Sequence, residues 1–198
     1  MPKQYYDYFQ PNFVSIDRLK GKPLLVNVRN IYTFLVSYYA DAKRTFFFDF
    51  LVEDSIAARK FKFPDFVKYL SEKTDGWVCK DLIFFQCFAQ PGGELVVDWV
   101  NRLESIDADM GAFLKTLSVP MANPIDHLNK NVSTDHRCSY DDQTIERVSQ
   151  TWADDIRLFG FQFDGTYSDD ALLYRDTKKW KGRIRYSINS KNLEVSGG

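Results

Sequence analysis

The stretch LLVNVRNIYTFLVSYY, residues 24–39, contains the pattern that indicates the fold. Leu24–Val28 is a short apolar run bounded by turn residues, which is typical of a strand buried on both faces. Asn30 stands where a helix N-cap is expected, and apolar side chains follow it at helical spacing: Ile31, Phe34, Leu35 and Tyr38. The sequence therefore predicts a strand, a tight turn and a helix that runs to about Phe48.

A second strand-then-helix unit follows further along the chain. After a turn at Pro91-Gly92-Gly93, the run Glu94–Val100 is typical of another buried strand, and about Asp107 to Leu117 shows helical spacing. Two such units predict an α/β fold with a largely parallel sheet flanked by helices. We expect Leu24–Val28 and Leu95–Val100 to lie in that one sheet, with the first helix packed against it.

Two further helices and a long loop complete the expected domain. Pro64 suits the first turn of a helix. A longer helix is expected over about residues 141–159, and Gly160 ends it. Residues 118–140, rich in Pro, Asn, Ser and Asp, are expected to form a long loop. We expect residues 1–198 to form a single domain.

Composition excludes several classes of protein. Of 198 residues, 44% are hydrophobic and 27% charged, which excludes intrinsic disorder. The formal net charge of −1 argues against a protein that wraps nucleic acid or coats an anionic membrane. No apolar run reaches about 18 residues, so no membrane span is expected, and the N-terminal residues do not resemble a secretory signal. The three cysteines are Cys79, Cys87 and Cys138, and they form no CxxC pair. We therefore expect free thiols, no metal site and a cytoplasmic location.

Three stretches resemble motifs of the carbohydrate sulfotransferases. Val28–Ser37, VRNIYTFLVS, resembles the sulfotransferase strand-to-helix motif V-R-N-P-x-x-R-x-x-S. Val97–Glu104, VDWVNRLE, is similar to the V-D-F-V-G-R-F-E strand of the carbohydrate group. The third stretch is Leu128–Asn131, then Tyr140–Asp142, then Asp155–Phe161. It is similar to that group's C-terminal signature, in which an L-N-K-S loop precedes a helix that ends in D-x-x-x-F-G-Y. The stretches keep the family order and cover about residues 24–163, which leaves residues 164–198 as a basic C-terminal extension.

The resemblance implies a P-loop-NTPase-like sulfotransferase fold that binds 3′-phosphoadenosine 5′-phosphosulfate as donor. It implies that Arg29 and Ser37 hold the 3′-phosphate of the donor and that Asn129 and Lys130 contact the nucleotide. Elementary physics supports the first assignment, because a helix N-terminus after a buried strand offers free N–H groups to an anion and arginine adds a forked contact. The alternative is that Arg29 pairs with a carboxylate at the edge of the core and Ser37 only fills space.

The implied reaction transfers a sulfuryl group from the donor to a hydroxyl of a carbohydrate acceptor. At the first motif the sequence has Ile31 in place of the usual proline and Thr33 in place of the usual second arginine. Residues 1–23 also contain no loop of the K-T-G/A-S/T-S/T type, which cradles the 5′-phosphosulfate in the family. The chain therefore resembles a sulfotransferase without its first βα unit. We expect either a piece of a longer enzyme or a non-catalytic module that binds nucleotide or sulfated glycan.

Other residues keep two interpretations each. Arg102 and Glu104 are expected on one side of an extended segment, either near a sulfate or as an ion pair at the sheet edge. His127 and His136 are either surface residues or candidates for the catalytic base, so the sequence does not assign that base. It does not assign an oligomeric state either. Residues 175–191 contain seven Lys or Arg against one acid and form an anion-binding surface, a half-exposed strand or a solvated face.

Overall fold

The computed structural model describes residues 25–44, 52–74, 78, 94–97, 99–121, 135–168, 171, 184–187 and 195–197. The helices are α2 (Ile31–Arg44), α3 (Val52–Lys60), α4 (Phe63–Glu72), α5 (Ile106–Thr116), α6 (Asp142–Thr151) and α7 (Ala153–Phe159). The strands are β1 (Leu25–Val28), β2 (Glu94–Val97), β3 (Trp99–Arg102), β4 (Ile184–Ser187) and β5 (Val195–Gly197). Two short 3₁₀ turns are η4 (Leu103–Ser105) and η5 (His136–Ser139). This part of the chain is mostly helical and has mixed α/β character.

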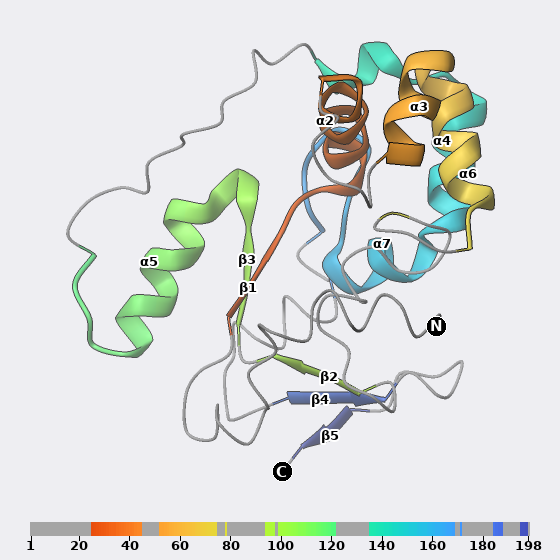
Figure 1. Ribbon diagram of the computed structural model, residues 1–198. Helices are drawn as coiled ribbons and strands as arrows, with labels where there is room; N and C mark the ends of the chain where they lie inside the picture. Colours follow the sequence, from red (N-terminus) through yellow and green to blue (C-terminus); the bar gives the residue numbers. More distant parts are fainter. Residues whose placement is uncertain are drawn as a thin grey trace.

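Strands β1 and β3 form a parallel pair, in a register from Leu25 opposite Trp99 to Val28 opposite Arg102. Figure 1 shows the two strands side by side, between α5 and the remaining helices. Val26 and Val28 of β1 and Val100 of β3 share one buried core with Ile31 and Leu35 of α2. The prediction of a parallel pair with the first helix packed against it is therefore confirmed for β1 and β3.

The predicted strand Glu94–Val100 is divided. Its first half is β2, which pairs antiparallel with β4, and β4 pairs antiparallel with β5. The prediction that all of Leu95–Val100 lies in the parallel sheet is thus wrong for Leu95–Val97. The reason is that β2 pairs with a segment about 90 residues further along the chain, and a local apolar run carries no information about such a distant partner. In the basic tail, Ile184–Ser187 adopts the strand conformation that was one of its alternatives.

Helix α2 begins as the sequence predicts. The side chain of Asn30 accepts a hydrogen bond from the Tyr32 amide at 3.0 Å, which is the expected N-cap. The helix ends at Arg44, and residues 45–50 lie outside the described part, so its predicted end near Phe48 is not tested. Helices α4 and α5 also lie close to their predicted positions.

The long helix expected over residues 141–159 is two helices. Asp141 is the N-cap of α6, and its side chain accepts a hydrogen bond from the Thr144 amide at 2.8 Å. The chain then turns at Trp152, whose backbone leaves the helical region, and continues as α7. Trp152 is fully buried, so the turn directs the largest side chain of this segment into the core. Gly160 ends α7 in a left-handed conformation, as predicted.

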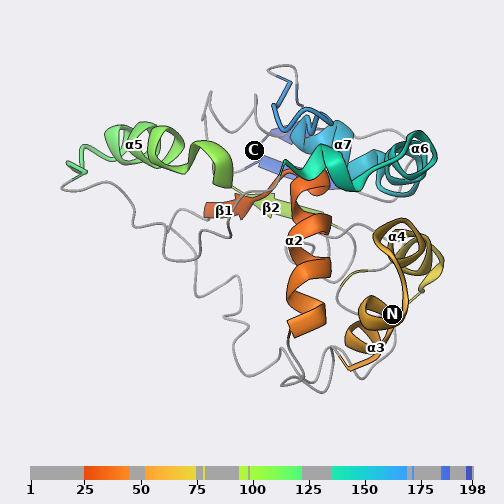
Figure 2. The same ribbon diagram turned by 90° about the horizontal axis from the view of Figure 1, so that it is seen from above.

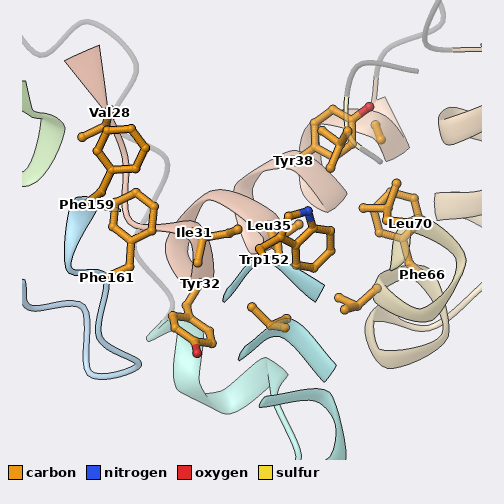
Figure 3. Packing of buried hydrophobic residues seen from close by; sticks show 14 of the residues in the cluster. Val28, Ile31, Tyr32, Leu35, Tyr38, Phe66, Leu70, Trp152, Phe159 and Phe161 are labelled. Atoms are coloured by element: carbon orange, nitrogen blue, oxygen red, sulfur yellow. The ribbon is translucent and has the colours of Figure 1, made fainter. Parts of the chain in front are cut away.

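Helix α2 lies at the centre of the molecule. Seen from above, α3 and α4 lie on one side of it, while α6 and α7 cross near its N-terminal end (Figure 2). Figure 3 shows Ile31 and Leu35 of α2 between Val28, Phe159 and Phe161 on one side and Phe66 and Leu70 on the other; all seven belong to one buried cluster. Helix α5 lies apart from this bundle and packs on β3, where the rings of Phe113 and Trp99 are 5.4 Å apart. No helix in the described ranges is long and apolar enough to span a membrane.

Candidate functional site

The candidate site is the junction between β1 and α2. Only Arg29 and Asn30 connect the strand to the helix. Because β1 and β3 are parallel and Val28 lies opposite Arg102, the residues that follow both strands meet at the same edge. The N-terminus of α2, which is the positive end of the helix dipole, is located at that edge.

Asn30 connects this junction to a turn near the end of the described helices. Asn30 is fully buried, and its side-chain Nδ2 donates to the backbone carbonyl oxygens of Gln162 at 2.8 Å and Thr166 at 3.1 Å. Tyr140 makes a second connection, since its hydroxyl donates to the Tyr32 carbonyl at 2.9 Å. The first and third motif-bearing stretches therefore meet at the start of α2 through Tyr140, and the residues just after the third stretch hold Asn30.

The Glu104 carboxylate caps the start of α2. Its Oε1 accepts hydrogen bonds from the backbone N–H of Asn30 at 3.2 Å and from the Thr33 hydroxyl at 3.0 Å. Its Oε2 accepts a hydrogen bond from the Tyr167 hydroxyl. A carboxylate at a helix N-terminus is stabilised by the helix dipole. Burial, and then the charge of Glu104, raise the pKa of Tyr167 well above its usual range, so the hydroxyl stays a donor.

Arg102 and Glu104 do not form the ion pair that was one alternative for them; each has its own partner. Arg102 pairs with the buried carboxylate of Asp109, with Nε and Oδ2 3.5 Å apart. The Arg102 guanidinium also lies 4.8 Å from the ring centre of Tyr167, in cation–π geometry. Tyr167 is thus held from both sides, by Arg102 on its ring and by Glu104 on its hydroxyl.

Arg29 is half-buried beside this cluster. Its Nε donates to the Thr33 hydroxyl at 3.4 Å. No carboxylate of the described residues lies within ion-pair distance of Arg29, so the alternative of a pair at the core edge is not observed there. The terminal nitrogens of its guanidinium also have no hydrogen-bond partner in that part of the chain. Within the described part of the chain, Arg29 is therefore a cation beside a helix N-terminus whose terminal donors have no partner.

The other predicted site residues are placed as follows. Ser37 is half-buried on α2, about two turns beyond Arg29, and the two side chains do not hydrogen-bond each other. Asn129, Lys130 and His127 lie outside the described residues. His136 has a packing role, because its Nε2 lies 2.6 Å from the Phe163 carbonyl oxygen and its ring contacts aromatic neighbours. Among the residues that the structure describes, no group of three His, Cys, Asp or Glu side chains could hold a metal ion.

Sequence reasoning missed Thr33 and Tyr167. Thr33 was noted only as a departure from the family motif, yet its hydroxyl contacts both Arg29 and Glu104. Tyr167 lies beyond the resembling stretches, and no local pattern distinguishes it from other tyrosines of the chain. Its position becomes visible only through the bridge between Phe161 and Tyr167, which folds that segment back on itself.

Comparisons with known proteins do not assign this chain to a family. No family model, no curated protein and no solved structure matches it. The argument for function therefore depends on the motifs and on the junction itself.

Proposed function

We propose that this chain is a carbohydrate sulfotransferase of the P-loop-NTPase-like fold and that the β1–α2 junction binds the 3′-phosphate of its nucleotide donor. The observation that carries the proposal is the position of Arg29. It is a half-buried cation at a helix N-terminus, directly after a strand of a parallel pair, with no carboxylate paired to it among the described residues.

Neutral donors hold the Glu104 carboxylate at the junction. It accepts hydrogen bonds from the Asn30 backbone amide and the Tyr167 hydroxyl, and the Thr33 hydroxyl, which also faces the Asn30 carbonyl oxygen, lies 3.0 Å from it. Arg29 makes no ion pair with a carboxylate of the described residues, so its charge is open to an anionic ligand. Phosphate oxygens match its forked donors, and such charge-assisted pairs are the strong class of hydrogen bond.

In this proposal the chain's residues hold and orient the donor. Arg29 and Ser37 contact the 3′-phosphate, and Asn129 and Lys130 contact the nucleotide. The donor supplies an activated sulfuryl group, which an acceptor hydroxyl on a carbohydrate attacks in line. The protein's contribution is positioning and the stabilisation of negative charge.

The experiment compares two nucleotides that differ only in the 3′-phosphate. Isothermal titration measures the affinity of adenosine 3′,5′-bisphosphate and of adenosine 5′-monophosphate for the wild-type chain and for Arg29→Ala. We expect Arg29→Ala to weaken the binding of the bisphosphate by more than about tenfold. A charge-assisted hydrogen bond is worth about 1.5–3 kcal/mol, and a tenfold change in affinity corresponds to about 1.4 kcal/mol. The affinity for the monophosphate is expected to stay unchanged.

Arg44→Ala is the matched control. Arg44 is an exposed arginine in the last turn of α2, at the opposite end of the helix from the junction, and pairs with Asp41 at 2.5 Å. It is expected to leave both affinities unchanged. Equal binding of the two nucleotides by the wild type, or equal loss for both in Arg29→Ala, would contradict the proposal.

A non-catalytic module with the same binding site is the second candidate. The observation that favours it is the absence from residues 1–23 of a K-T-G/A-S/T-S/T loop for the 5′-phosphosulfate. Such a module binds the bisphosphate through Arg29 but does not transfer the sulfuryl group. Titration and a transfer assay together distinguish the two candidates.

A further inference from the structure

A relay of hydrogen bonds connects Glu104 to Arg29 through one hydroxyl. Thr33 Oγ1 lies 3.0 Å from Glu104 Oε1, 2.9 Å from the Asn30 carbonyl oxygen and 3.4 Å from Arg29 Nε. A hydroxyl has a single proton to donate and lone pairs that accept. Glu104 and the carbonyl are acceptors only, so they share the single Thr33 proton and a lone pair of the hydroxyl is left for the Arg29 N–H.

The far end of this relay is itself fixed. Glu104 is held by the Asn30 backbone amide at 3.2 Å and by the Tyr167 hydroxyl, and Asn30 is fully buried. The direction of the Thr33 hydroxyl is therefore set by an exposed carboxylate that the buried Asn30 and the half-buried Tyr167 hold in place. Arginine has a long side chain, and binding through it costs conformational entropy unless the side chain is already oriented.

We propose that Thr33 and Glu104 are positioning residues that orient the Arg29 guanidinium toward the ligand. The proposal rests on the proposed function, since it assumes that Arg29 binds the 3′-phosphate. Thr33 stands where the resembling motif has an arginine, so the relay replaces a second cation with orientation of the first. Neither residue needs to touch the ligand.

The test uses Thr33→Val, which keeps the branched shape and removes the hydroxyl, and Thr33→Ser, which keeps the hydroxyl. The readout is the ratio of affinities for adenosine 3′,5′-bisphosphate and adenosine 5′-monophosphate, measured by titration on the full chain. We expect Thr33→Val to lower that ratio about three- to tenfold, the range of one neutral hydrogen bond, and Thr33→Ser to restore it. A change that only loosens the fold would lower both affinities and leave the ratio unchanged. Thr33→Ala is the second variant if Thr33→Val does not fold.

The double variant Arg29→Ala/Thr33→Val tests whether Thr33 acts through Arg29. Once Arg29 is absent, Thr33→Val is expected to have no further effect on the ratio. A further loss in the double variant would mean that Thr33 touches the phosphate itself and would overturn the positioning role. An unchanged ratio in Thr33→Val, with a loss in Arg29→Ala, would overturn this inference and leave the proposed function standing. No effect of Arg29→Ala on the ratio would overturn the proposed function, and this inference with it.

Discussion

Asp54 is a buried charge that connects three helices of the molecule. Its carboxylate is fully buried and accepts hydrogen bonds from Tyr38 at 2.5 Å, Tyr69 at 3.0 Å and Lys73 at 2.6 Å. Burial, and then the charge of Asp54, raise the pKa of Tyr69 to about 12. Burial lowers the pKa of Lys73, but the hydrogen bond and charge of Asp54 outweigh that effect and raise it, so the lysine stays charged. These contacts connect α2, α3 and the end of α4.

Lys73→Met is expected to destabilise the fold by about 3 kcal/mol, because it leaves a buried carboxylate without its cation. Denaturation by urea measures this loss. The control is Lys68→Met on the exposed face of α4, with an expected change within about 0.5 kcal/mol. The double variant Asp54→Asn/Lys73→Met is expected to recover part of the lost stability, because it removes both charges and leaves no buried charge without a partner at this position. A Lys73→Met variant as stable as Lys68→Met would show that the pair contributes nothing.

At the scale of elements, the sequence predicted what depends on local pattern. The strand Leu25–Val28, the Asn30 cap and the stop at Gly160 follow from apolar runs and from residues with particular backbone preferences. Two features could not be predicted in this way. The turn at Trp152 interrupts an apolar stripe that continues from α6 into α7, so apolar periodicity does not mark the break. The assignment of β2 to another sheet depends on β4, which lies far along the chain.

Gly160→Ala is expected to destabilise the protein by about 2–3 kcal/mol. Gly160 has a φ of 71°, and a Cβ there would lie 2.6 Å from the Ala171 Cβ and 2.7 Å from the Ser168 carbonyl oxygen. The left-handed conformation alone costs an L-residue about 1–2 kcal/mol, and the close contacts add to that. Thermal unfolding midpoints measure the change.

The matched control for this prediction is Gly165→Ala. Gly165 also has a positive φ, 88°, but a Cβ there would lie 3.4 Å from the His136 Cε1, which is ordinary contact. Only the conformational cost of about 1 kcal/mol is expected. If the two variants lost equal stability, the packing argument for Gly160 would be wrong.

At the scale of the whole molecule, the site is assembled from segments that are distant in sequence. Glu104 and Tyr167 reach the start of α2 from 71 and more than 100 residues along the chain. The sequence placed Arg29 at a strand–helix junction because strand, cap and helix are consecutive. It could not predict that Glu104 and Tyr167 reach this junction, because side chains brought together by the fold leave no local spacing to detect. The mixed α/β character was predictable, whereas the separation into a parallel pair and an antiparallel sheet was not.

The 198-residue chain is expected to bind adenosine 3′,5′-bisphosphate but to transfer little or no sulfate. The charge that develops during transfer lies on the 5′ side of the donor, and residues 1–23 contain no loop of the type that supplies N–H groups and a lysine there in the resembling family. Loss of one preorganised donor typically costs about 10²–10³ in rate, so the lack of a cradle should cost more. The 3′-phosphate contacts come from a different junction and do not depend on that loop. Transfer of radiolabelled sulfate to a panel of glycans measures the activity, with Arg29→Ala as the control for any residual signal. Robust turnover that Arg29→Ala abolishes would show that other residues of this chain stabilise the 5′ side, and that the chain is a complete catalyst.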